Sequence, residues 1–143
     1  MIRILLAATA IAFGTSAVFA QGNVIAERQD LMKRSGAQAR IGSQMVRGEA
    51  PYDQARAQAV LANFADKAAK LPNLFPDNSR TGETRALPAI WEKRADFNAA
   101  VANFASDVKA AQASTKDLDS FKTALTTVGR HCGTCHEAFR RSR

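Results

Sequence analysis

The stretch that decides the fold is LDSFKTALTTVGRHCGTCHEAF, residues 118–139. Its apolar and thiol side chains recur at alternating spacings of three and four residues, at Leu118, Phe121, Leu125, Val128, Cys132, Cys135 and Phe139. This spacing places all of them on one face of a helix. Residues 114–117, Ser-Thr-Lys-Asp, mark its start, because a hydroxyl oxygen can accept from free backbone N–H groups and Asp117 favours the positive end of the helix dipole.

Three earlier segments show the same helical period, and no segment shows the alternation typical of a strand. They span residues 23–47, 51–70 and 88–111, and the last begins at a proline, which the first turn of a helix tolerates. Two of the connectors are short, which makes neighbouring helices antiparallel. The third connector, residues 72–87, carries two prolines that cannot continue a helix. We therefore predict an all-α chain folded as an antiparallel up-down-up-down four-helix bundle.

Residues 1–20 have the pattern of an export signal. A short basic start, Met1-Ile2-Arg3, precedes an almost wholly apolar run from Ile4 to Phe13, and Val18-Phe19-Ala20 is a small-residue cleavage pattern. The apolar run is shorter than the roughly 20 residues that a membrane-spanning helix needs. We expect the signal to be removed after Ala20, which leaves residues 21–143 as one soluble, exported domain with no membrane span.

The charge of the chain is moderately basic. It has 20 Lys and Arg against 13 Asp and Glu, a formal net charge of +7, and removal of Arg3 with the signal leaves +6. Nucleic-acid-binding surfaces usually cluster basic residues with aromatic ones, whereas here the charges are spread over the polar sides of the helical patterns. The composition therefore argues against nucleic acid as a partner and favours proteins with acidic surfaces.

The sequence Cys132-Gly133-Thr134-Cys135-His136 carries the chemistry. Cys-x-x-Cys-His is the pattern at which haem is attached to a protein. On a helix, two thiols three residues apart lie on one face, so both can add to the vinyl groups along one porphyrin edge. The adjacent imidazole then reaches the iron as its proximal ligand. We expect one haem c per chain, bound covalently by two thioethers at Cys132 and Cys135, with His136 as ligand.

Three other chemistries of these residues are less well supported. A redox-active thiol pair is typically at the start of a helix that follows a strand, where the dipole lowers a thiol pKa, whereas this pair ends an all-helical chain. Zinc would require His131 and His136 to converge with both thiols on one ion. A structural disulfide would close so short a loop that it stabilises little.

An exported four-helix chain that ends in Cys132-Gly133-Thr134-Cys135-His136-Glu137-Ala138-Phe139-Arg140 resembles the class II cytochromes c, the cytochrome c prime family. The likeness covers the whole of residues 21–143, the expected cytochrome domain. Three further stretches are similar to the low-spin, cytochrome c-556 type of that family: RGEAPYD (47–53), LPNLFP (71–76) and IWEKR (90–94).

The sixth coordination position of the iron separates two kinds of protein within this family. If the first and last helices are antiparallel, His136 lies level with the N-terminal part of the first. At 1.5 Å per residue, Met32 is about 12 Å from a helix start near Val24 and Met45 about 31 Å, so only Met32 is at the right level. The resemblance adds that Leu31-Met32-Lys33 matches the context of the ligating methionine in low-spin members. High-spin members have a leucine, methionine or aromatic residue there that only shields the iron, and ordinary core packing is a further alternative for Met32. We expect Met45 to be core.

Two arginines lie one helical turn from the expected ligands. Arg28 precedes Met32, Arg140 follows His136, and the carboxylates of haem attract cations. The resemblance also places arginines near the haem at these positions, although an exposed, solubilising role is the alternative for both. We expect His131 to be a surface residue and Trp91 to pack in the core or at the bundle end. The predicted walls of the haem pocket are Phe104, Phe121, Leu125 and Phe139.

Together these features predict a periplasmic monohaem electron-transfer protein with His136 and Met32 as axial ligands. The sequence shows no acid/base pair or nucleophile of the kind that would indicate an enzyme. Expected partners are redox proteins, with acidic surfaces favoured, and the resemblance allows a homodimer through the first two helices. The main alternative is a five-coordinate cytochrome c prime that binds nitric oxide or carbon monoxide, and a weaker one is a bundle without haem whose cysteines form a disulfide.

Overall fold

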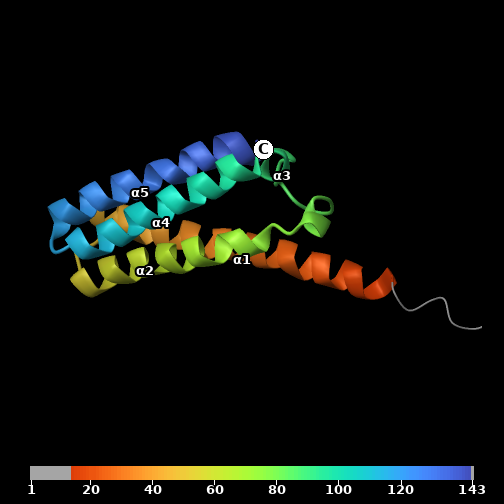
Figure 1. Ribbon diagram of the computed structural model, residues 1–143. Coiled ribbons are helices and arrows are strands. Elements are labelled where there is room, and N and C mark those ends of the chain that lie inside the picture. The colour runs from red at the N-terminus through yellow and green to blue at the C-terminus, as the bar shows by residue number, and fades with distance from the viewer. Residues whose placement is uncertain (1–13, 143) are drawn as a thin grey trace, which may run out of the picture.

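Four long helices form the bundle in the computed structural model, which describes residues 14–142 and, from Val24 onward, their side chains. They are α1 (Gly14–Val46), α2 (Gln54–Lys70), α4 (Arg94–Ser114) and α5 (Leu118–Phe139). Each packs against two others, in the order α1, α2, α4, α5 and back to α1, and consecutive long helices run in opposite directions (Figure 1). The predicted all-α, up-down-up-down four-helix bundle is confirmed.

The last helix starts at a capping box. The Asp117 carboxylate accepts from the backbone N–H of Ser120 at 2.8 Å, and the Ser120 hydroxyl accepts from the backbone N–H of Asp117 at 3.0 Å. The hydroxyls before Asp117 do not cap it, because Ser114 ends α4 and Thr115 follows as that helix's C-cap. The carboxylate is therefore the cap, and the predicted hydroxyl cap is wrong.

The ends of the other helices also differ from the sequence pattern. Asp53 caps α2 by accepting from the backbone N–H of Arg56 at 2.6 Å, so the helix begins at Gln54 and not at Pro51. Helix α1 begins at Gly14, well before the predicted start near residue 23, because no proline interrupts the intervening residues. The expected cleavage point after Ala20 thus lies within α1, and residues 1–13 of the expected signal lie outside the described residues.

The predicted single helix over residues 88–111 is two helices. The short α3 (Ala89–Glu92) is separated from α4 by Lys93, whose φ of −114° and ψ of 49° are not helical. The break accompanies anchoring of the preceding connector: Trp91 Nε1 donates to the carbonyl of Phe75 at 3.1 Å, and the Arg94 guanidinium donates to the same carbonyl at 2.7 Å. Trp91 is buried at this end of the bundle, as predicted.

The long connector is tied to the end of α5. It forms two short 3-10 turns, η1 (Leu71–Leu74) and η2 (Asp77–Ser79), and then pairs Ala86 with Arg140 in an isolated antiparallel bridge. The backbone N–H of Leu87 donates to the carbonyl of Phe139 at 3.0 Å. Apart from this bridge, residues 14–142 contain no strand. The connector therefore closes over the part of the bundle that contains the cysteines.

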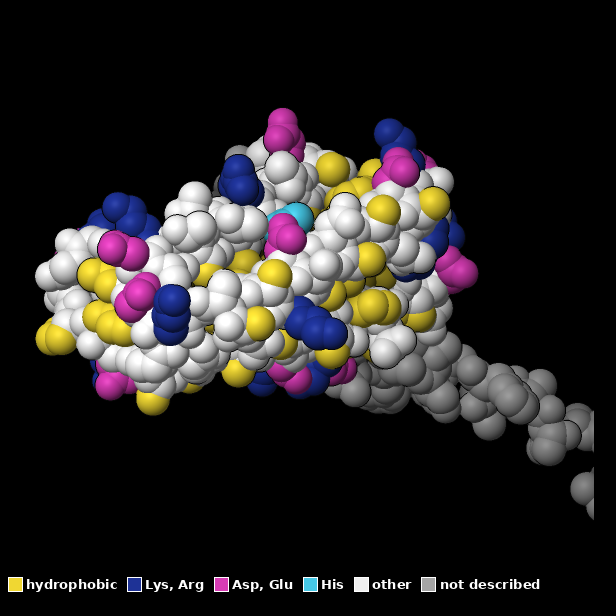
Figure 2. Space-filling model, turned by 60° about the vertical axis from the view of Figure 1, so that its left-hand side comes forward, with side chains coloured by type: hydrophobic (Ala, Val, Ile, Leu, Met, Phe, Trp, Pro, Cys, Tyr) yellow, Lys and Arg dark blue, Asp and Glu magenta, His cyan; other side chains and the backbone are white. Residues whose placement is uncertain are grey.

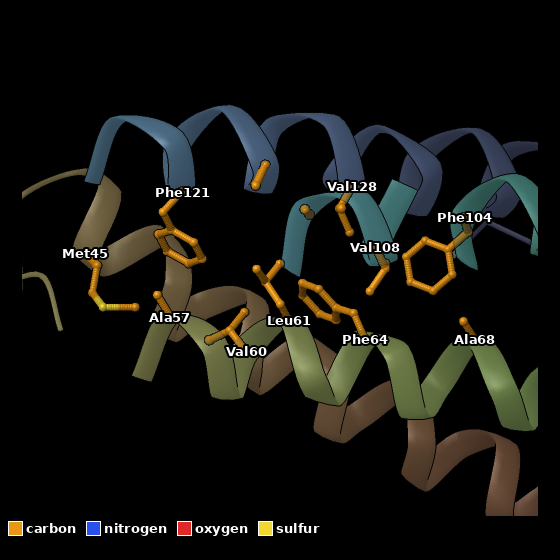
Figure 3. Packing of buried hydrophobic residues seen from close by; sticks show 12 residues of the cluster. Met45, Ala57, Val60, Leu61, Phe64, Ala68, Phe104, Val108, Phe121 and Val128 are labelled. Atoms are coloured by element: carbon orange, nitrogen blue, oxygen red, sulfur yellow. The ribbon is translucent and has the colours of Figure 1, made fainter. Parts of the chain in front are cut away.

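The buried side chains form two clusters along the bundle. One cluster, shown in Figure 3, includes Met45 and Phe121 at one end of the close-up and Phe104 at the other. The other cluster lies under the connector and contains Leu31, Leu71, Leu74, Phe75, Ile90, Trp91, Phe97, Val101 and Phe139. Met45 is core, as predicted. Among the residues searched, no helix is both long and apolar enough to cross a membrane.

Candidate functional site

The cysteine motif occupies the last turns of α5 and turns its reactive groups inward. Cys132 and Cys135 are free thiols, both half-buried, and the His136 imidazole is half-buried beside them. Gly133 and Thr134 between them are exposed, and the Thr134 hydroxyl donates back to the carbonyl of Arg130 at 3.2 Å. The helix thus points both thiols inward and leaves the intervening pair in solvent.

Two hollows adjoin this turn of α5. A cavity of about 460 Å³ is bordered by α1, the connector and the ends of α4 and α5, and its lining includes Met32, Phe97, Cys135 and His136. Its volume is within the range of about 300–1,000 Å³ that is usual for cofactor sites. A smaller hollow of about 40 Å³ continues toward Cys132, and Met32, Cys135 and His136 line it as well. The thioether of Met32 is therefore on the same hollow as both thiols and the imidazole.

A larger depression of about 650 Å³ lies elsewhere, between the end of α2, the start of the connector and α4. Its lining contains no cysteine, histidine or methionine. It offers no thiol, imidazole or thioether to a haem, so the candidate site is the pair of hollows at the cysteine motif.

Burial controls the protonation of the site. It lowers the pKa of His136, and the positive charges of Arg140, Lys67 and Arg85 act in the same direction. Burial also raises the pKa of the Cys135 thiol. The neutral imidazole that these effects favour is the form of histidine that binds a metal.

The two predicted arginines line the larger cavity in different ways. Arg28 is only 5% exposed; its guanidinium donates to the hydroxyl and the carbonyl of Ser79, both at 3.2 Å, and lies 4.7 Å from the centre of the Phe75 ring. Burial lowers the pKa of Arg28, but a guanidinium stays charged. Arg140 is exposed at the rim of the cavity. Both cations therefore border the space that holds the candidate cofactor, and their role toward its carboxylates stays a prediction.

Three sequence predictions about the surroundings are wrong. His131 is half-buried, with its Nε2 2.7 Å from the carboxylate of Asp107 on α4 and its ring against Phe104, so it is not a free surface residue. Phe121 and Leu125 pack with the Met45 cluster and do not line either hollow. Phe121 is about 21 Å along the helix from Cys135 at 1.5 Å per residue, too far to touch the site.

Phe104 and Phe139 do line the hollows, one each, as predicted. Among the further residues that line the hollows, and that the sequence pattern did not assign to the site, are Phe75, Phe97 and Lys67. Phe97 was recognisable only as part of an apolar stripe, and Lys67 could have been noticed as a charge within the stripe of α2 that includes Phe64 and Leu71.

The donor set fits a covalently attached haem. Two inward thiols three residues apart match the vinyl groups of one haem, and an adjacent imidazole and a thioether on the same hollow match its iron. The mainly apolar cavity matches the ring, and several cations at its border, Arg28 and Arg140 among them, match the carboxylates. The alternatives fit less well. No group of three or more His, Cys, Asp or Glu side chains that could hold a metal ion occurs among the residues searched, and the two thiols are not joined.

Comparison with known proteins agrees with this site. Residues 23–140 match the cytochrome c′ family over nearly all of the expected domain. The chain belongs to the cytochrome c′ family. It is 38% identical over 145 residues to a cytochrome c-556 of Rhodopseudomonas palustris, which covers 98% of this chain and 97% of that protein. It is 41% identical over 140 residues to a cytochrome c′ of the same organism, covering 97% of this chain and 96% of the other.

The fold of the chain also matches solved structures of this family. The solved structure of cytochrome c′ from Rhodopseudomonas palustris superimposes with a TM-score of 0.80 at 42% identity, covering 84% of this chain and 97% of that one. The protein is thus a monohaem cytochrome of the cytochrome c′ family with covalently bound haem c, and Cys132 and Cys135 are the two cysteines of its sequence. Relatives named c-556 and c′ match to a similar degree, so the choice between their types rests on the residues of this site.

Proposed function

We propose that the protein is a periplasmic one-electron carrier whose haem iron is bound by His136 and Met32. The observation that carries the proposal is the place of Met32, which lines both hollows together with Cys135 and His136. Met45 is buried in the other cluster and cannot serve. Met32 is thus the one methionine of residues 21–143 within reach of the site.

The residues of the chain have distinct tasks in this proposal. When bound, the haem supplies an iron that alternates between ferric and ferrous by one electron. His136 would provide a neutral imidazole and Met32 a thioether on the same hollow, and Arg28 and Arg140 would supply positive charge for the carboxylates. Phe97 and the cluster beneath the connector exclude water. With both axial positions filled, no position is left for a substrate, which is why we expect no enzymatic activity.

The surface suits brief encounters with partner proteins. Lys and Arg side chains are interspersed with Asp and Glu on the face seen in Figure 2, so the charge of this face is spread and not gathered in one basic patch. A spread charge attracts an acidic partner without binding it tightly, as electron transfer requires. The partners we expect are redox proteins with acidic surfaces. A second copy of the chain, bound through α1 and α2, is compatible with the proposal.

The optical spectrum of the wild-type protein tests the proposal. Two strong axial ligands hold the iron low-spin, so the ferrous protein should show the sharp, split bands of six-coordinate haem and bind carbon monoxide slowly or weakly at neutral pH. Absorption spectra with and without carbon monoxide measure both properties. A high-spin ferrous spectrum with prompt carbon monoxide binding would overturn the proposal in favour of a five-coordinate gas-binding cytochrome, in which Met32 only shields the iron.

Export can be tested separately from ligation. If residues 1–20 are a signal that is removed before or during haem attachment, intact mass spectrometry of the haem-loaded protein should show an N-terminus at Gln21, within a residue or two. The matched control is the same protein expressed with residues 1–20 deleted, which should remain in the cytoplasm without haem. Haem-loaded protein that still begins at Met1 would contradict export as assigned here.

A further inference from the structure

Lys67 is a buried cation next to the haem site. It lies on the inner face of α2 and is only 6% exposed. Its Nζ is 4.4 Å from the centre of the Phe104 ring and 5.4 Å from that of Phe64. Within the described part of the chain it makes no ion pair, and the two aromatic faces are its partners. This differs from Lys70 one turn later, which is about half exposed and pairs with Asp66 at 2.8 Å.

Lys67 lies next to the residues that are expected to hold the haem. It lines the smaller hollow together with Met32, Cys132, Cys135 and His136. Because Lys67 shares this hollow with both cysteines, it would lie near the attached edge of a haem bound there, whereas Arg140 borders only the larger cavity. Burial lowers the pKa of Lys67, whereas the negative faces of two aromatic rings stabilise the charged ammonium.

We infer that Lys67 is a buried charge that raises the reduction potential of the haem. Reduction adds one electron to the iron, and a nearby positive charge stabilises the more electron-rich ferrous state. The effect is large only where screening is weak, and the ammonium is shielded from solvent by Phe64 and Phe104. The inference requires a bound haem. The biological use of a raised potential rests on the proposed electron-carrier function, because a carrier works only at a reduction potential between those of its partners.

Redox titration of charge-removing variants tests the inference. Lys67→Gln removes the charge and keeps a polar side chain, Lys67→Leu removes it with an apolar one, and Lys67→Arg keeps it. The matched control, Lys70→Gln, removes an exposed charge from the same helix. None of these variants introduces a methionine or histidine that could bind iron.

Removal of the buried charge is expected to favour ferric haem. At fixed ambient potential, Lys67→Gln and Lys67→Leu should lower the ferrous-to-ferric ratio about tenfold, which for one electron is about 59 mV. The shift should persist at high salt, because a buried charge is poorly screened. Lys67→Arg should keep the wild-type potential, and any small effect of Lys70→Gln should vanish with added salt.

Two results would overturn the inference. One is an unchanged potential in both Lys67→Gln and Lys67→Leu, which would mean that the buried amine is neutral or too far from the iron. The other is an equal fall in Lys67→Arg, which would assign the effect to altered packing. Absorption spectra of the same samples report the spin state, so a high-spin wild type would refute the ligation by Met32 while leaving the comparison of potentials valid.

Discussion

The double variant Cys132→Ala with Cys135→Ala should yield a colourless protein that holds no haem on a denaturing gel. The two thioethers expected at these cysteines would be the covalent attachment, and without them only the iron ligands and packing would retain the cofactor. The loss also empties an apolar cavity. If even a fifth of the 460 Å³ stays unfilled, the folded state loses about 2 kcal/mol at ~24 cal/mol per Å³ of cavity.

Haem staining after denaturing electrophoresis and extraction with acid acetone measure this result directly. In the wild type the haem should stay with the polypeptide through both treatments. Thr134→Ala is the matched control, because Thr134 lies between the two cysteines but its side chain faces solvent, so this variant should retain its haem. Wild-type protein whose haem is extracted, or a double variant that keeps it, would contradict covalent attachment at these cysteines.

Local sequence patterns were sufficient for the existence of the four long helices, though not for all of their ends, and for the attachment motif. The alternating spacing from Leu118 to Phe139 identifies one face of α5, and all seven residues of that stripe lie on that helix. Cys-x-x-Cys-His needs no tertiary information, because its spacing alone places two thiols on one face beside an imidazole. These features depend on residues close together in the chain.

Periodicity shows which face of a helix a residue occupies, but not its position along the axis of the bundle. Periodicity assigns Phe121 and Cys135 to the same face of α5, but it does not say that one packs beside Met45 and the other at the haem site. Met32 could be placed at the level of His136 from the antiparallel arrangement of the first and last helices, although α1 begins at Gly14 and not near Val24, the start from which its position was measured. The same reasoning applied along α5 excludes Phe121 and Leu125 from the pocket.

Contacts between distant segments account for the remaining differences. Lys67, Arg28 and His131 carry polar groups that usually face solvent, yet each is accommodated by a partner far away in the sequence: the Phe104 ring, Ser79 and Asp107. The break at Lys93 likewise accompanies hydrogen bonds from Trp91 and Arg94 to the connector. No local pattern predicts such pairings, because they exist only once the bundle has formed.

Met32→Ala is expected to convert the haem from low-spin to high-spin and to open it to carbon monoxide. Loss of the thioether leaves His136 as the single strong ligand. A site that is open only part of the time binds a gas with an affinity reduced by that fraction. If Met32 leaves about 1% of the iron open, its removal should tighten apparent carbon monoxide binding about 100-fold. Spectra of the ferrous protein and a carbon monoxide titration measure the two changes together.

Two further variants separate ligation from packing. Met32→Leu keeps most of the volume of the side chain but lacks sulfur, so it should become high-spin like Met32→Ala while unfolding closer to the wild type. Met45→Leu alters a methionine that is 1% exposed in the other cluster, and such a swap typically costs less than about 1.5 kcal/mol. It should leave the spectrum low-spin, because the sulfur of Met45 is not at the haem. If Met32→Leu instead kept the low-spin bands and the slow carbon monoxide binding of the wild type, the sixth ligand would have to come from another side chain, and Met32 would be a packing residue of the distal wall.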